Sequence, residues 1–411
     1  MKHLLTKRTL LIAVATAFLL VAWNREINLL YGIFSLIAST IILSHLLPRF
    51  ALKGVSASRA LDPTAFEGDA LHLKVSVENR SWRSRFMLEV LDSIPAAPPG
   101  SRNPMTFLAK LPARKERNYS YSLTCYKRGE YDVGPLTVQS AYPLGISPTE
   151  KEMPQSRRGL LVYPKIFELA RVRLRGGGNR PLSGVEAISQ AGAGEEFWGV
   201  REYKRGDDLR YIHWPSTAKH RRLIVKEFEI RASTEVTILL DLHKDSDVGE
   251  GKETTLEYAV KIAASMAKTL LEKGHVLQLV GYGRKNHIVP YTRGLNQLQK
   301  VLEELARVKA DGTMPYPHAI CQSSDLLRDG GAVILLFSRS DFNTEEALYA
   351  LRLLRAKRIR PLCVMIDHNS FIPGRITLSP ETNPFVEDLT SEGIPFYFIS
   401  KGDSLPEIFT A

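Results

Sequence analysis

A short run of apolar residues, Val236 to Leu240, ends abruptly in Asp241 and constrains how the second half of this chain can fold. A strand that is buried on both faces of a parallel sheet has this composition. Amphipathic helices and apolar strands alternate after it, and we expect helices over 256–270, 295–308 and 344–357 and strands over 276–282, 332–337, 360–366 and 394–399. This alternation predicts an α/β domain with a doubly wound, mostly parallel sheet.

Two apolar segments near the N-terminus predict a membrane hairpin. Residues 9–23 carry no charge, and a second apolar run covers 27–47 after a polar break. A membrane-spanning helix needs about 20 apolar residues, which the second run has and the first approaches. A basic start followed by an apolar run also describes a cleaved signal peptide. The second run follows at once, which favours a pair of spanning helices.

Basic residues flank both outer ends of this predicted hairpin. Lys2, Lys7 and Arg8 precede the first run, and Arg49 and Lys53 follow the second. By the positive-inside rule, both ends face the cytoplasm. The 3 cysteines are widely separated and odd in number, which fits a reducing compartment. We therefore expect a multi-pass protein of the cytoplasmic (inner) membrane whose soluble part lies in the cytoplasm.

Residues 52–164 have a different pattern, with short strands in place of helices. Apolar and polar side chains alternate over 71–77, as in a half-buried strand. Further strands are expected around 86–90, 119–123 and 134–138, with no helix between them. This spacing predicts a small β-sandwich of immunoglobulin-like type. The sandwich contains no catalytic constellation, so we expect it to be a spacer or docking module near the membrane.

The net charge of the chain is strongly positive. A formal charge of +11 predicts a partner or surface of negative sign, and nucleic acid and anionic lipid are both candidates. Arginines at 171, 173, 175 and 180 surround the glycines 176–178, and such a run can bind phosphate. The run lacks the ending of a P-loop and opens no helix, so a solvated linker explains it better.

Aromatic and charged residues alternate between the predicted sandwich and the α/β domain. Phe197, Trp198, Tyr203 and Tyr211 are interleaved with charges around a turn at 206–208. This pattern favours a surface ribbon over a buried strand.

This segment contains the motif Gly194-x-Glu196-Phe197, Arg201-Glu202-Tyr203, Gly206-Asp207-Asp208-x-Arg210-x-Ile212-x-Trp214, Ala218 and Val225-Lys226-Glu227-Phe228. In these residues the chain resembles domain-of-unknown-function family fifty-eight. The motif is long and specific. The family is bacterial and archaeal and couples this signature to a von Willebrand factor A-like domain. Its members are usually encoded beside a MoxR-type AAA+ ATPase and a membrane protein with a transglutaminase-like domain.

The resemblance and the residue patterns together predict four parts. These are a transmembrane helical hairpin over 1–50, an immunoglobulin-like β-sandwich over 51–165, a basic linker with the signature ribbon over 166–235, and a von Willebrand A-like domain over 236–411.

The resemblance also implies a candidate metal site after Asp241. A-type domains bind Mg²⁺ through an Asp-x-Ser-x-Ser loop with a Thr and an Asp from later loops, because hard cations prefer oxygen ligands. Here the loop reads Asp-Leu-His-Lys-Asp-Ser, and a later loop that begins at Ser338 supplies the second Asp. The candidate ligands are Asp241, Asp245, Ser246 and Asp341. Because Lys244 and Arg339 bring positive charge, we expect a degenerate site, with Mg²⁺ as its one candidate cofactor.

The sequence has no pattern typical of a hydrolase active site. No Gly-x-Ser-x-Gly elbow is present, and Cys363 lies in an apolar strand. The pair His318-x-x-Cys321 is a weak signal for a zinc or thiol site. The acidic residues around Asp207 and Asp208 are interleaved with arginines, which favours salt-bridged strand faces over an acid–base pair. We therefore expect no enzymatic activity.

The best-supported function is that of a membrane-anchored binding or adaptor protein. The resemblance implies a MoxR-type AAA+ ATPase as partner, with a transglutaminase-like membrane protein and membrane lipid as further partners. The expected contacts are Arg201, Glu202, Asp207, Asp208, Arg210 and Trp214. Two alternatives stay open: a hydrolase acting with the transglutaminase-like partner in peptide or cell-wall metabolism, and a module that binds anionic lipid or nucleic acid. Aromatic residues can stack on bases, but the membrane anchor argues against nucleic acid.

Overall fold

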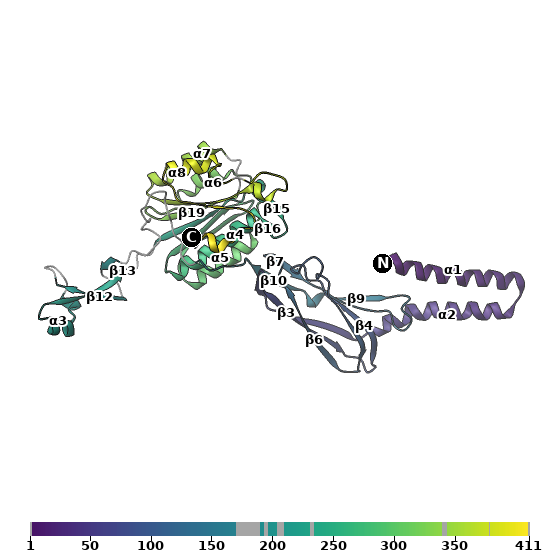
Figure 1. The fold of residues 1–411 in the computed structure, drawn as a ribbon. Coiled ribbons are helices and arrows are strands. Elements are labelled where there is room, and N and C mark those ends of the chain that lie inside the picture. The colour runs from purple at the N-terminus through teal and green to yellow at the C-terminus, as the bar shows by residue number, and fades with distance from the viewer. Residues whose placement is uncertain are drawn as a thin grey trace. The chain divides into compact units, whose positions relative to one another are not determined.

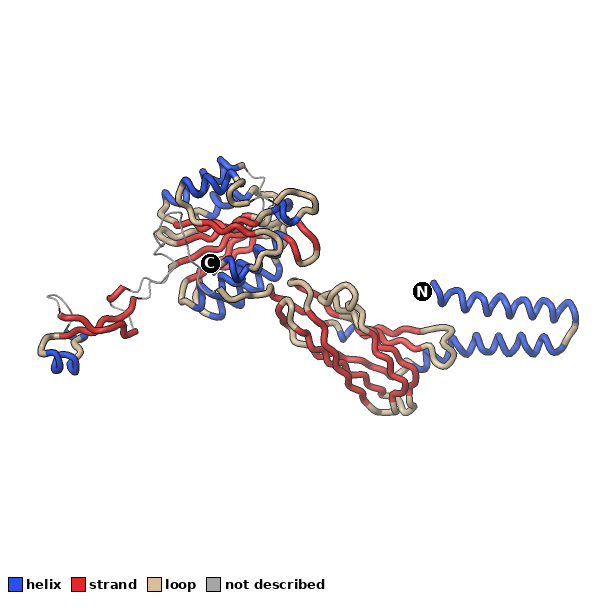
Figure 2. The backbone as a smooth tube through the Cα atoms, viewed as in Figure 1, coloured by secondary structure: helices blue, strands red, loops and turns tan. Residues whose placement is uncertain are grey.

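The computed structural model of this protein describes residues 2–169, 190–192, 196–203, 209–230, 234–338, 343–377 and 379–409. The chain divides into two compact units, Met1–Tyr163 and Pro164–Ala411. Figure 1 labels many of the helices and strands of both units, and Figure 2 distinguishes helix from strand by colour.

Two long helices open the first unit. α1 spans Lys2–Arg25 and α2 spans Asn28–Ala51, so only Glu26 and Ile27 lie between them. α2 is long and apolar enough to cross a membrane and is hardly buried, whereas the apolar part of α1, Thr9–Arg25, is shorter. Both apolar runs are therefore helical, and within the described residues one helix, α2 near the N-terminus, has the length and composition of a membrane span.

The remainder of the first unit consists mainly of strands. They are β1 (Val55–Ala60), β2 (Thr64–Phe66), β3 (Ala70–Asn79), β4 (Arg85–Leu91), β5 (Met105–Leu111), β6 (Glu116–Thr124), β7 (Gly129–Val133), β8 (Leu136–Ser140), β9 (Thr149–Met153) and β10 (Arg158–Tyr163). Their sheet orders are β1-β3-β6, β2-β10-β7 and β5-β4-β8-β9. Every second residue of β3 from Leu71 to Val77 is buried, which confirms the alternation predicted for this strand.

The β1-β3-β6 and β5-β4-β8-β9 sheets share one apolar core. Val75 and Val77 of β3 belong to the same buried cluster as Leu88 of β4 and Val138 of β8. Leu52, which follows α2 directly, is buried in this cluster too. The strand-rich unit is thus joined to α2 through its own core.

The second unit contains a six-stranded sheet in the order β18-β17-β14-β19-β20-β21. The strands are β14 (Glu235–Leu240), β17 (Val276–Tyr282), β18 (Asn286–Thr292), β19 (Ala332–Phe337), β20 (Arg360–Ile366) and β21 (Phe396–Ile399). All neighbours are parallel except β17 and β18, which are antiparallel. The predicted mostly parallel sheet is confirmed, and a two-stranded hairpin of β15 (Gly249–Glu250) and β16 (Glu253–Thr254) follows β14.

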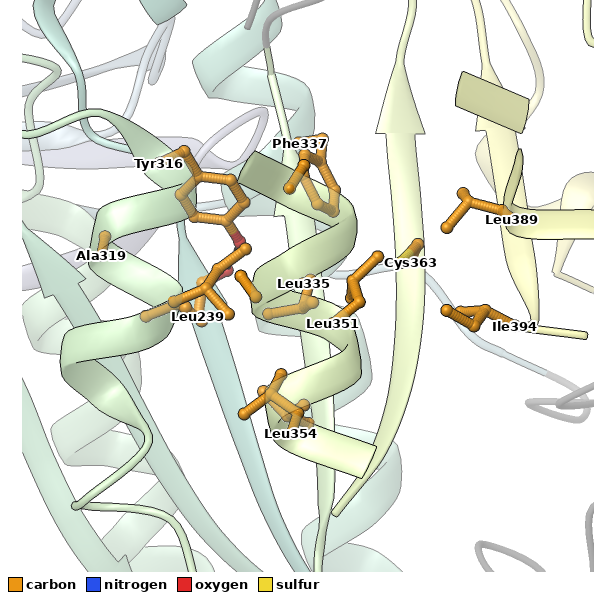
Figure 3. Close-up of a cluster of buried hydrophobic side chains, with 14 of the residues drawn as sticks. Leu239, Tyr316, Ala319, Leu335, Phe337, Leu351, Leu354, Cys363, Leu389 and Ile394 are labelled. Carbon is orange, nitrogen blue, oxygen red and sulfur yellow. Dashed lines mark hydrogen bonds between the residues drawn. The ribbon is translucent and has the colours of Figure 1, made fainter. Parts of the chain in front are cut away.

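Helices cover both faces of this sheet. α4 and α5 lie on one face and α6, α7 and α8 on the other (Figure 1). The helices are α4 (Thr255–Glu272), α5 (Leu295–Arg307), α6 (Tyr316–Ser323), α7 (Thr344–Ala356), α8 (Pro384–Ser391) and α9 (Leu405–Ile408). Figure 3 shows the core under α6 and α7, where Leu239, Leu335 and Cys363 of adjacent strands meet helical side chains. The Tyr316 hydroxyl donates to the Leu239 carbonyl at 2.8 Å and ties α6 to the sheet.

The strand β18 and the helices α6 and α8 are among the elements that were not predicted from the sequence. The edge strand β18 is only half buried and contains Pro290, so its apolar pattern is weak. α6 and α8 have 8 residues each and begin with proline in the first turn. Two helical turns are too short for a 3.6-residue period to stand out.

Candidate functional site

The signature segment forms a small sheet. β12 (Glu196–Glu202) pairs antiparallel with β13 (Ile224–Ile230), and β11 (Gln190–Gly192) pairs with the other edge of β13. The β12–β13 register places Glu202 opposite Ile224. The sequence pattern predicted a surface ribbon here, and its described part is the sheet β11-β13-β12 (Figure 1).

A short helix, α3 (Trp214–His220), lies between these strands and was not predicted. Pro215 stands in its first turn, where the missing N–H of proline costs no hydrogen bond. The His213 amide donates to the Ile224 carbonyl at 2.8 Å, and the Ile224 amide donates to Thr217 Oγ1 at 3.0 Å. These two bonds fasten α3 to the start of β13.

Large apolar side chains are exposed on and beside α3. Trp214 is 65% exposed and Leu209 is 63% exposed, while Tyr211 and Leu223 are a little under half exposed. We call these four residues the signature patch. Ile224 is buried at the start of β13, so the small sheet covers some apolar groups and presents others. Exposed apolar groups that gather in one place commonly mark a binding surface.

Beside the patch, Glu202 and Arg222 form an ion pair with an Nη1–Oε1 distance of 2.7 Å. Both side chains are more than two-thirds exposed, so the pair adds little to the stability of the fold. Sequence reasoning had selected Glu202 but not Arg222. The antiparallel register brings the two residues together, and spacing along the chain gives no sign of it.

The structure describes four of the six predicted contact residues. Arg201 and Glu202 end β12, Arg210 lies in the 3₁₀ turn Leu209–Tyr211, and Trp214 begins α3. Val225 pairs with both Arg201 and Ile212, which brings the end of β12 and the start of α3 to one end of the small sheet. Asp207 and Asp208 lie outside the described residues, as does the predicted basic linker at 171–180.

A second group of polar residues lies at the carboxyl edge of the large sheet. Asp241, Ser338 and Asp367 directly follow the adjacent strands β14, β19 and β20, and each is at most 3% exposed. This edge is where open α/β sheets bind ligands. Sequence reasoning missed Asp367, although it follows an apolar run in the same way as Asp241, so the same signal could have found it.

The two aspartates of this edge accept hydrogen bonds from their own loops. Asp241 Oδ1 accepts from the His243 amide at 3.1 Å, and Asp367 Oδ1 accepts from the Asn369 amide at 3.1 Å. Ser246 Oγ donates to the Asp241 carbonyl oxygen at 3.3 Å. The Asp245 amide donates to His243 Nδ1 at 3.2 Å, and Asp245 Oδ2 lies 3.5 Å from the same nitrogen.

The predicted magnesium ligands fit a cation only in part. The Ser246 hydroxyl already donates within the loop, the Asp245 side chain is 54% exposed, and Asp341 lies outside the described residues. The Ser338 hydroxyl is fully buried and has no hydrogen-bond partner in the part of the chain that the structure describes. Asp241 and Ser338 are therefore the side chains best suited to a hard cation, and the metal site stays a prediction. Among the described residues, no group of three or more His, Cys, Asp or Glu side chains is arranged to hold a metal.

The cysteines are protonated at neutral pH. Burial raises the pKa of the Cys125 thiol to about 11 and that of the Cys363 thiol further. Burial also raises the pKa of Cys321, and the nearby Glu346 charge adds to the effect. His318 Nε2 lies 3.8 Å from a Glu346 oxygen, so it faces α7. A thiolate nucleophile is not favoured at any of the three positions.

Comparison with known proteins gives a family and one curated relative. Residues 199–369 match the sequence model of the family described as "Protein of unknown function DUF58". The chain is 23% identical over 283 residues to "Uncharacterized protein YeaD" of Bacillus subtilis (strain 168), which covers 67% of this chain and 68% of YeaD.

Likeness to solved structures is limited to parts of the chain. The CARDB domain of the PF1109 protein from Pyrococcus furiosus matches with a TM-score of 0.21 and 12% identity, over 26% of this chain and 86% of that one. A β-glucosidase from Listeria innocua matches with a TM-score of 0.16 and 18% identity, over 24% of this chain and 16% of that one. TM-scores of this size support no functional inference.

Proposed function

Because this chain belongs to the DUF58 family, a family of proteins of unknown function that it matches over residues 199–369, we propose that it is a membrane-anchored, non-enzymatic adaptor. Its partner is a MoxR-type AAA+ ATPase, and it serves the assembly or activation of a protein complex. α1 and α2 form a two-helix transmembrane hairpin of the inner membrane, and the soluble part lies in the cytoplasm. The apolar length of α2 supports the anchor, and the resemblance described above supplies the partner.

The proposal includes a von Willebrand A-like domain over 236–411. The sheet order β18-β17-β14-β19-β20-β21, with a single antiparallel edge pair and helices on both faces, supports this architecture. In this domain the loop after Asp241 is pinned to Gly312, because the Gly312 amide donates to the Leu242 carbonyl at 2.9 Å. A fixed loop of this kind offers a rigid surface to a partner.

The signature patch is the observation that carries the proposal. Tryptophan, tyrosine and arginine are enriched among the residues that dominate the binding energy of protein interfaces, and the two aromatic side chains bury a large apolar area. Trp214 and Tyr211 are exposed here, and the Glu202–Arg222 pair lies at the same end of the small sheet. An apolar patch rimmed by charges is the usual composition of a docking site for another protein.

The test is capture of the ATPase by the detergent-solubilised chain. We expect Trp214→Ser to weaken capture at least about tenfold, since loss of an interface hot spot costs roughly 2 kcal/mol or more. The double variant Arg201→Ala, Asp208→Ala should abolish capture. Trp82→Ser is the matched control, because Trp82 is also strongly exposed, at 71%, and lies in the first unit.

Two other outcomes would argue against the signature patch as the docking site. Capture that survives both signature variants would rule out the patch as the docking site. A loss that Trp82→Ser reproduces would point to a general effect of removing an exposed tryptophan.

A further inference from the structure

The first unit contains a cleft that the proposed function does not use. It has a volume of about 1210 Å³ and lies between the helical pair and the outward face of the β5-β4-β8-β9 sheet. Ile12 of α1 and His45 and Arg49 of α2 line one wall, and Met87 and Phe107 line the other. Small-molecule sites typically measure roughly 300–1,000 Å³, so the cleft is large enough for a ligand of that size.

Part of the cleft is apolar. Ile12, Met87 and Phe107 are each between 43% and 52% exposed, although all three are large hydrophobic residues. Phe107 pairs with Glu89 across β4 and β5, on the face opposite the buried Leu88 and Val90. The sheet therefore directs apolar groups away from its own core and into the cleft.

The cleft also contains charges of both signs. His45 and Arg49 are four residues apart on α2 and so lie on one face of the helix. Within the described part of the chain, no hydrogen bond or ion pair holds the Arg49 side chain. Glu89 and Glu150 line the side of the cleft formed by the sheet, and Gln139 Nε2 donates to Glu89. Arg49 thus gives the helix wall a positive charge, and Glu89 and Glu150 give the sheet wall a negative charge.

If α2 anchors the chain in the membrane, as the proposed function states, the length of this helix determines how deep in the membrane the cleft lies. A helix of 24 residues such as α2 is about 36 Å long, against a hydrocarbon core of about 30 Å. Its last turns, which carry His45 and Arg49, then reach the headgroup layer. Leu52 is buried in the sandwich core, and Arg85 Nη2 donates to the Lys53 carbonyl at 2.6 Å, so α2 is fixed to the sheet.

We propose that the cleft binds one phospholipid whose headgroup carries both a phosphate and a primary amine, of the phosphatidylethanolamine class. Arg49 and His45 donate hydrogen bonds to the phosphate, the two sheet carboxylates bind the ammonium group, and the apolar residues cover the glycerol and the start of the acyl chains. The carboxylates disfavour a headgroup that is only anionic, because like charges would meet. This inference rests on the membrane anchor and uses no residue of the signature patch.

The test uses the full chain, reconstituted in nanodiscs that contain phosphatidylethanolamine and phosphatidylglycerol, with retained lipid identified by native mass spectrometry. We expect one phosphatidylethanolamine per chain. Arg49→Gln should lower its retention about tenfold, because it removes a charge-assisted bond to phosphate. Glu150→Gln should shift the preference towards phosphatidylglycerol. Lys53→Gln is the matched control: its exposed cation lies four residues beyond Arg49 and does not line the cleft.

Two results would overturn the inference. Equal retention in the wild type and in Arg49→Gln would mean that any bound lipid is adventitious, and equal retention of the two lipids by the wild type would remove the amine recognition. Soluble glycerophosphoethanolamine is added as a competitor in a separate experiment. If it displaces all of the lipid at equal concentration, the ligand is the free headgroup and not the membrane lipid.

A carbonate extraction of the same membranes separates this proposal from the anchor itself. A chain that leaves the membrane contradicts the anchor and with it the cleft. A chain that stays embedded but retains no lipid contradicts the cleft alone. ATPase capture is measured independently and affects neither result.

Discussion

Arg59 and Asp92 form an ion pair inside the first unit, with side chains 0% and 4% exposed. Arg59 Nε donates to Asp92 at 3.1 Å, and the Tyr121 hydroxyl donates to the same carboxylate. Burying two charges costs several kcal/mol per ion unless their hydrogen bonds are satisfied. Here the carboxylate accepts from both partners, so the pair is tolerated in the core although it is expensive to break.

Removal of one charge of this pair should therefore destabilise the first unit strongly. Asp92→Asn leaves the guanidinium buried without its counter-charge, and we expect the free energy of unfolding to fall by about 3–5 kcal/mol. Amide hydrogen exchange of β1 and β4 measures this locally. Arg80→Gln is the control, because Arg80 pairs with Glu78 at 2.7 Å at the surface and its loss should change exchange little. Unchanged exchange in Asp92→Asn would contradict the prediction.

Cys125 gives the first unit a sensitivity to alkaline pH. Its pKa is raised by burial from 9.0 to about 11 in the folded chain. Below pH 9 the thiol is neutral in both states, and between pH 9 and 11 only the unfolded chain ionises, so stability is lost as the pH rises through this window. Two pKa units correspond to roughly 2–3 kcal/mol at most.

We expect Cys125→Ala to lose less stability than the wild type between pH 8 and pH 11, measured as the change in unfolding free energy with pH. Cys321→Ala is the comparison, since Cys321 is partly exposed and outside this unit. Parallel pH profiles of the wild type and Cys125→Ala would show that the thiol does not ionise differently in the two states.

Among the elements, α7 was expected to begin at residue 344, and the polar residues at this end decide how the helix is capped. In the structure Asn343 is the cap, and its side-chain oxygen accepts from the amides of Glu345 at 3.1 Å and Glu346 at 3.5 Å. Thr344 is the first residue of the helix. Both residue types are good caps, so only the backbone geometry decides between them.

The two positions should respond differently to alanine. Asn343→Ala removes the acceptor for two free amides and should cost about 1 kcal/mol of stability. Thr344→Ala places a good helix former inside the first turn and should be close to neutral. Thermal unfolding of the two variants compares them directly, and a larger loss for Thr344→Ala would reassign the cap.

At the scale of the whole molecule, the sequence predicted the apolar strands best. The bounds of β17, β19 and β20 coincide with the predicted ranges, because a strand buried on both faces is an uninterrupted apolar run between polar ends. β18 and α3 were missed, since the half-buried edge strand has a weak pattern and α3 is only 7 residues long. Sequence patterns also gave no sign of Arg222 beside Glu202, because only the strand register determines which side chains meet.

The N-terminal anchor is tested by an arginine in α2. Leu36 is 68% exposed near the middle of this helix, and Leu295 is 75% exposed on α5. In water either substitution is tolerated, because neither side chain packs in a core. In a bilayer, arginine near the centre of a span costs roughly 2.5–3.5 kcal/mol. Leu36→Arg should therefore move protein from the carbonate-resistant membrane fraction to the extractable one, whereas Leu295→Arg should not. If both variants and the wild type partition equally between the two fractions, α2 does not span the membrane. The cleft beside the β5-β4-β8-β9 sheet would then lie in water and not at a membrane surface.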